Sequence, residues 1–221
     1  MTGARPRICA SIVDADLPSI KKAESRVDLF EVRIDLVGSG WREVARCLKK
    51  PWIDCNRRAE EGGKWGGSER DRIKELLGAL ELGASIIDIE LATPGIGRIV
   101  KEIKGRAECL LSCHDFKGTP PLKKLKQIIE SERDAGADIC KVVTTARNFT
   151  DNLTVLQLIG EFPENRVIAF AMGAAGQISR LFCPLAGGYF TYSSIKKGRE
   201  SADGQITVGE LWKIYGMMGR E

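Results

Sequence analysis

The sequence predicts an α/β protein in which parallel strands close into a single (β/α)8 TIM barrel, formed by one domain that spans residues 1–221. Short apolar or β-branched runs recur about every 20 to 35 residues, and a segment with helical periodicity follows each run. This alternation is typical of parallel strands joined by right-handed crossovers. An open doubly wound sheet is the alternative. No GxGxxG motif follows the first predicted strand, so the barrel is favoured.

Eight segments fit the strand pattern. They are RICASI (7–12), LFEVRI (29–34), WIDCN (52–56), SIIDIEL (85–91), CLLSCHD (109–115), ICKVVTT (139–145), RVIAFAM (166–172) and YFTYSS (189–194). Between them, Ser68 is the expected cap of one helix, and Thr119-Pro120-Pro121 begins another. A last helix has its apolar face at Val208, Leu211, Trp212 and Tyr215.

Composition limits the classes of function. The net charge of +4 comes with no basic tract, which favours a small anionic molecule over nucleic acid as the partner. No run of eighteen apolar residues and no signal peptide are present, so we expect no membrane association and a cytoplasmic location. Seven cysteines without a CxxC pair indicate reduced thiols.

Polar side chains interrupt several predicted strands at every second position, although strands of a parallel sheet are usually apolar throughout. They are Glu31 and Arg33, Asp54 and Asn56, Asp88 and Glu90, Ser112 and His114, and Lys141. Because catalytic groups of such barrels come from the C-terminal ends of several strands, the pattern predicts one polar site there. A buried network of ion pairs is the alternative.

Two other kinds of site are disfavoured. Cys113 and His114 are adjacent in a strand, so they point to opposite faces and cannot form a nucleophile–base pair. A metal site would have to use one histidine and two cysteines, Cys109 and Cys113, that lie about 13 Å apart in an extended strand. We therefore expect no metal and no cofactor.

Lys141 lies inside the apolar strand DICKVVTTA. Burial lowers the pKa of a lysine, and we expect Arg33, Arg57 or Arg180 nearby to lower it further. A neutral amine attacks ketones to form a Schiff base, and His114 on the preceding strand could serve as general acid and base. A lysine whose ammonium group reaches water at the strand end is the alternative.

Six motifs occur together: EVRID (31–35), RRAEEGG (57–63), SCHDF (112–116), DICKVV (138–143), AMGAAGQISR (171–180) and SADGQ (201–205). On these motifs the chain resembles the type I 3-dehydroquinate dehydratases of the shikimate pathway. The resemblance implies that Lys141 forms the Schiff base, His114 moves protons and Glu61 is the partner of His114. It implies that Glu31, Arg33, Arg57, Met172, Arg180, Ser201 and Gln205 bind the substrate, and that the protein is a homodimer.

The sequence departs from this family at two positions. Asp203 replaces a frequent proline of the loop over the substrate, and Phe170 replaces a frequent methionine of the pocket. Two other functions remain open. An aldolase acting on a sugar phosphate is one, to which Gly187-Gly188 gives slight support, and a binding protein without turnover is the other.

Overall fold

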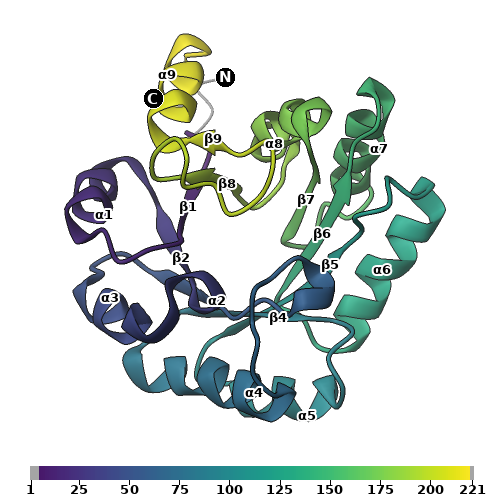
Figure 1. Cartoon of the computed structure of the whole chain (residues 1–221). Helices are drawn as coiled ribbons and strands as arrows, with labels where there is room; N and C mark the ends of the chain where they lie inside the picture. The colour runs from purple at the N-terminus through teal and green to yellow at the C-terminus, as the bar shows by residue number, and fades with distance from the viewer. Residues whose placement is uncertain (1–4, 220–221) are drawn as a thin grey trace.

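The computed structural model describes residues 5–219 and has strands inside a ring of helices (Figure 1). The strands are β1 (Ile8–Ile12), β2 (Leu29–Arg33), β3 (Trp52–Cys55), β4 (Ile86–Glu90), β5 (Glu108–His114), β6 (Ile139–Thr145), β7 (Val167–Met172), β8 (Thr191–Ser194) and β9 (Ile206–Thr207). Their order is β7-β6-β5-β4-β3-β2-β1-β8-β9, and every pair is parallel. The predicted barrel fold and its eight strands are confirmed, while the two-residue β9 was not predicted.

Nine α-helices are described. They are α1 (Leu17–Ala23), α2 (Ile34–Val37), α3 (Trp41–Cys47), α4 (Glu69–Gly78), α5 (Ile96–Ile103), α6 (Leu122–Asp134), α7 (Phe149–Gly160), α8 (Gln177–Phe182) and α9 (Val208–Met217). Short 3-10 helices occupy Glu24–Arg26, Gly38–Gly40, Ala59–Glu61, Ala79–Leu82, Ala174–Gly176 and Pro184–Ala186. Ser68 caps α4 by accepting a hydrogen bond from the Asp71 N–H, as predicted. Within residues 5–219, no helix combines the length and the apolar character needed to cross a membrane.

The barrel interior is filled in layers, because alternate residues of each strand point inward. An apolar layer fills the end where the strands begin, and it includes Leu29, Ile53, Leu110, Ile139 and Ile168, all at most 1% exposed. One inward position further along, polar side chains replace apolar ones on most strands, among them Glu31, Asp88, Ser112 and Lys141, whereas β3 and β7 place Cys55 and Phe170 there. The polar residues of the barrel therefore stand on an apolar floor.

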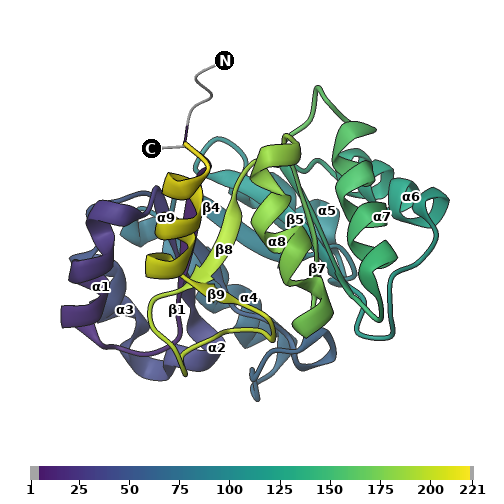
Figure 2. The same ribbon diagram turned by 90° about the horizontal axis from the view of Figure 1, so that it is seen from above.

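The seam between β7 and β8 differs from the rest of the wall. These two strands share no strand pairing among the described residues. The Tyr189 N–H donates a hydrogen bond to the Val167 carbonyl at 2.9 Å, and the rings of Phe170 and Tyr192 pack edge to face with centroids 6.0 Å apart. Side-chain packing therefore completes the barrel at this seam. Figure 2 shows α9 lying beside β8 and β9 next to it.

Candidate active site

One cavity of about 430 Å³ lies where the strands end, above the apolar floor. All ten predicted site residues line it: Glu31, Arg33, Arg57, Glu61, His114, Lys141, Met172, Arg180, Ser201 and Gln205. Glu31 and Gln205 share this cavity although 174 positions separate them in the sequence, so the fold brings distant residues together.

Lys141 is 4% exposed and its amine has three close partners. Nζ lies 2.8 Å from Asp88 Oδ2 and 3.7 Å from Glu31 Oε1, and it donates a hydrogen bond to the Tyr192 hydroxyl at 3.1 Å. We expected arginine neighbours, but the Asp88 carboxylate contacts both the amine and the Arg57 guanidinium and so lies between them. The alternative in which the ammonium group of Lys141 reaches water at the strand end is wrong, because this amine is held inside the barrel.

The backbone of Lys141 is also held from outside the sheet. Glu132 of α6 is fully buried, and its Oε2 accepts a hydrogen bond from the Lys141 N–H at 3.1 Å. Burial raises the pKa of Glu132 well above its usual value. This contact could not be predicted from sequence, since Glu132 lies in a helix rich in charged residues.

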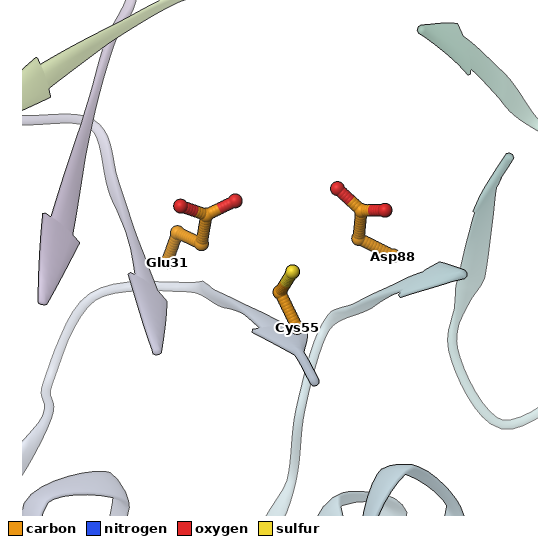
Figure 3. Close-up of side chains that lie close together, drawn as sticks. All are labelled: Glu31, Cys55 and Asp88. Carbon is orange, nitrogen blue, oxygen red and sulfur yellow. The ribbon is translucent and has the colours of Figure 1, made fainter. Parts of the chain in front are cut away.

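Glu31, Cys55 and Asp88 project toward one another from β2, β3 and β4 (Figure 3). One ligand-type atom of each lies within 4.8 Å of the others, so the group has the spacing of a metal site. Burial raises the pKa of Cys55 well above its usual value, which keeps its sulfur a thiol rather than a metal-binding thiolate. The two carboxylates already face the Lys141 amine, so the cluster serves as the counter-charge of that lysine.

Arg57 is fixed by acidic partners. Its Nη2 contacts Asp88 Oδ1 at 2.7 Å, and its Nη1 donates to Glu90 at 3.0 Å and to Ser112 Oγ at 2.6 Å. Although burial raises the pKa of Asp88, the charges of Arg57 and Lys141 lower it well below its usual value. Asp88 therefore stays ionised between its two cations. The three side chains cannot rearrange without leaving a buried charge unpaired.

His114 and Glu61 form a second pair at the cavity mouth. Glu61 Oε2 lies 2.8 Å from His114 Nδ1 and accepts a hydrogen bond from the His114 backbone N–H at 3.1 Å. Burial, followed by the charges of Arg57 and Lys141, lowers the pKa of His114 well below its usual value. Burial raises the pKa of Glu61 to about 7. The imidazole is therefore neutral at pH 7, the state required of a general base.

The turn that carries Glu61 depends on glycine. A Cβ on Gly63 would lie 1.9 Å from the carbonyl oxygen of Arg57, so only glycine lets the chain fold back this closely. The turn brings Glu61 over the end of β5, where it meets His114.

Arg180 enters the cavity from α8 and is 2% exposed. Its Nη2 donates to the Asp203 carbonyl at 3.2 Å, its guanidinium lies 4.4 Å from the centre of the Phe170 ring, and its Nε has no partner among residues 5–219. Burial lowers its pKa to about 10, so it remains a cation at pH 7. A buried guanidinium with free donors is suited to a carboxylate.

The loop after β8 covers the cavity and is tied to the barrel. Gln205 Oε1 accepts a hydrogen bond from the Ser201 N–H at 2.9 Å. Gln205 Nε2 donates to Ser11 Oγ at 3.3 Å, and Ser11 in turn donates to Glu31 at 2.7 Å. Asp203 contributes its carbonyl oxygen to Arg180, a contact that any residue at this position can make.

Asp54 and Asn56 do not join the cavity, so this part of the predicted polar site is wrong. Cys55 points inward, which turns the neighbouring side chains outward beneath the helices. The four polar side-chain atoms of Asp54 and Asn56 are buried without a hydrogen-bond partner among residues 5–219. We had assigned Asp54 rather than Cys55 to the inward face of β3. A shift of one residue moves every side chain of a strand to the other face.

Two aromatic residues of the cavity were missed from the sequence. Tyr192 lies at an inward-facing position of β8. The alternation of faces along the predicted strand YFTYSS could have indicated this. Phe116 stacks on His114, with ring centroids 6.5 Å apart and planes 22° apart. It belongs to the SCHDF motif, but its ring could not be placed from sequence because it follows the end of β5.

A family model described as type I 3-dehydroquinase matches residues 8–221. The 3-dehydroquinate dehydratase of Dehalococcoides mccartyi (strain ATCC BAA-2266 / KCTC 15142 / 195) is 42% identical over 211 residues, which cover 95% of each chain. The Methanosarcina mazei enzyme of the same name is 37% identical, covering 96% of this chain and 94% of its own. The crystal structure of the 3-dehydroquinate dehydratase from Geobacillus kaustophilus has a TM-score of 0.83 and 26% identity, covering 99% of this chain and 94% of that chain.

Proposed function

Because the chain belongs to the type I 3-dehydroquinase family, whose reaction removes water from 3-dehydroquinate in the shikimate pathway, we propose that it catalyses this dehydration through a Schiff base on Lys141. The observation that carries the proposal is the position of the Lys141 amine. It lies inside the cavity, and His114 lines the same cavity. An amine nucleophile and a neutral imidazole are the two groups that imine-based elimination needs.

The lysine supplies the electron sink. Its amine adds to the C3 ketone of dehydroquinate, and loss of water gives an iminium that acidifies the proton at C2. The carboxylates of Asp88 and Glu31 stabilise the positive charge of the iminium nitrogen. Hydrolysis of the final imine releases 3-dehydroshikimate.

His114 moves the proton. With Glu61 ionised, Nδ1–H donates to its carboxylate, and Nε2 is left with a lone pair that can accept the C2 proton. The resulting enamine expels the C1 hydroxyl, and His114 returns the proton to the leaving oxygen as general acid. Glu61 therefore acts by fixing the tautomer and orientation of the imidazole.

The remaining residues bind the substrate in this proposal. Arg180 receives the carboxylate with its free donors. Glu31, Arg33 and Arg57 bind hydroxyl groups, since their charged heads line the cavity. Met172 forms an apolar wall, and Ser201 and Gln205 close the loop over the bound molecule.

We further propose that residues 1–221 act as one catalytic domain, because one barrel carries the whole site. A cytoplasmic location is supported by seven cysteines that are all free thiols. A homodimer is supported by large exposed apolar side chains on the neighbouring helices α7 and α8. These side chains are Phe149, Leu153, Ile178 and Phe182. Sedimentation of the chain and of a Leu153→Glu variant tests the dimer, which the variant should weaken.

The direct test of the reaction is turnover of 3-dehydroquinate, followed in the ultraviolet as the conjugated enone product forms. The chain should convert the substrate without added metal or cofactor. No product at micromolar enzyme concentration would reject the proposed activity, and a matched preparation of Lys141→Met measures the background.

A further inference from the structure

The hydroxyl of Tyr192 is the only uncharged partner close to the Lys141 amine among the described residues, and nothing in the family comparison gives it a role. It lies 3.1 Å from Nζ, which donates the hydrogen bond. The ring is 4% exposed, and Nζ lies 4.2 Å from its centre. No residue between 5 and 219 accepts the phenol's own hydrogen, so that hydrogen is free to reach a bound molecule.

We propose that Tyr192 is a catalytic residue that relays a proton between the Lys141 nitrogen and the carbonyl oxygen of the substrate when the imine forms and when it is hydrolysed. The inference rests on the Schiff base proposed above and deepens it. The phenol accepts an N–H hydrogen bond on one side and donates its O–H on the other.

The relay balances in each direction. When the neutral form of the amine adds to C3, a C–N bond forms and the C=O π bond breaks, so nitrogen must lose a proton and oxygen must gain one. Direct transfer between these atoms would need a strained four-membered ring. Through the phenol, the transfer passes around a six-membered ring of nitrogen, hydrogen, phenol oxygen, hydrogen, carbonyl oxygen and carbon. Tyr192 gives one proton and takes one, so it ends unchanged.

The surroundings keep the phenol in the form that this relay needs. Burial, followed by the charges of Glu31 and Asp88, raises the pKa of Tyr192 well above its usual value, so it stays protonated. The carboxylates near Nζ are poorly suited to the same task. Asp88 is held ionised by two cations, and Glu31 already accepts the Ser11 hydroxyl hydrogen.

Tyr192→Phe removes the hydroxyl and keeps the ring. Tyr189→Phe is the matched control, because Tyr189 lies just before the same strand and its hydroxyl faces Arg166 rather than the cavity. In a single turnover with 3-dehydroquinate, samples quenched with borohydride at successive times give imine adducts of substrate and product, which mass spectrometry separates by the mass of one water.

In Tyr192→Phe the imine should form about 10²-fold more slowly, the scale of general acid–base catalysis, while the control stays within about twofold of the original chain. Conversion of the substrate adduct to the product adduct should keep its rate, since His114 performs that step; a general distortion of the site would slow both. Equal imine formation in Tyr192→Phe and the original chain overturns the relay alone. Absence of any adduct in the original chain overturns the Schiff base and, with it, the relay.

Discussion

The two sides of the cavity differ in chemistry. The side formed by β2 to β5 carries charged groups held by short contacts, among them Asp88, which pairs with Arg57, and His114, which contacts Glu61. The side formed by β7 and β8 carries Phe170, Met172 and Tyr192. Lys141 on β6 lies between them. The charged side can fix hydroxyls and move protons, while the aromatic side can limit water around the proposed imine.

The two sides also differ in how they are held. Strand pairing is continuous from β1 through β7, whereas the seam between β7 and β8 relies on packing and one backbone hydrogen bond from Tyr189. A charged group that is already paired needs little reorganisation during the reaction. We therefore expect positions on the charged side to tolerate substitution least, and the two apolar positions of the aromatic side, Phe170 and Met172, to tolerate it most.

Apart from the loss of Lys141 itself, the largest effect is expected for His114→Ala on the charged side. Turnover should fall by about 10² to 10⁴, because the general acid and base is lost. Imine formation should persist, since the Lys141 amine remains. Steady-state rates and borohydride trapping measured on the same preparation separate these two steps, and near-normal turnover would assign the proton transfer to another residue.

The pH dependence should report on Glu61. As the pH falls below about 7, Glu61 becomes protonated and donates to His114 Nδ1, which places the imidazole hydrogen on Nε2 and blocks proton uptake. The rate constant kcat should then fall about tenfold for each unit by which the pH drops below about 7. Above pH 7, Glu61 should cause no further change in kcat.

Glu61→Gln is the matched variant for this test, because the amide keeps the shape and cannot titrate. Its rate should be low and should lack the acid limb near pH 7. An unchanged limb in this variant would show that a different group titrates.

Arg180→Lys should have an intermediate effect, although it keeps the charge. An ammonium cannot present the parallel donors that a carboxylate takes from a guanidinium, so substrate binding should weaken by about 1 to 3 kcal/mol. The Michaelis constant and kcat of the variant provide the measurement. If both were unchanged, Arg180 would not bind the substrate.

The smallest effect is expected for Phe170→Leu on the aromatic side. Leucine keeps the wall apolar but removes the ring face that lies 4.4 Å from the Arg180 guanidinium. Such contacts contribute about 0.5 to 2 kcal/mol, so the Michaelis constant should rise about 2- to 30-fold with little change in kcat. A larger loss of activity than that of His114→Ala would contradict the ordering of the two sides.

Much of the fold could be predicted because strand and helix periodicities alternate along the whole chain. The inward face of β3 could not, since the polar residues Asp54 and Asn56 share one parity and were therefore placed inward, whereas the structure turns Cys55 inward. The weak seam at β7 and β8 depends on how the barrel curves, which local sequence does not encode.

The candidate site was predicted in a similar way. The charged residues stand out because a parallel strand is expected to be apolar, so Glu31 and Lys141 were conspicuous. Tyr192 was not, because an aromatic residue in a strand is the ordinary case. The positions of the Asp88 and Glu31 carboxylates beside the Lys141 amine were not predicted either. Distances between side chains on different strands follow from register, which sequence alone leaves open.

We propose that Lys141 is buried in the barrel so that its amine can form an imine with a ketone. Treatment with dehydroquinate or dehydroshikimate followed by borohydride tests it most directly. We predict inactivation with one adduct per chain, mapped by peptide mass to Lys141, while exposed lysines such as Lys123 and Lys124 remain unlabelled. Lys141→Met should lose both labelling and turnover and keep the fold. An adduct mapped to another lysine, or full activity in Lys141→Met, would contradict the account.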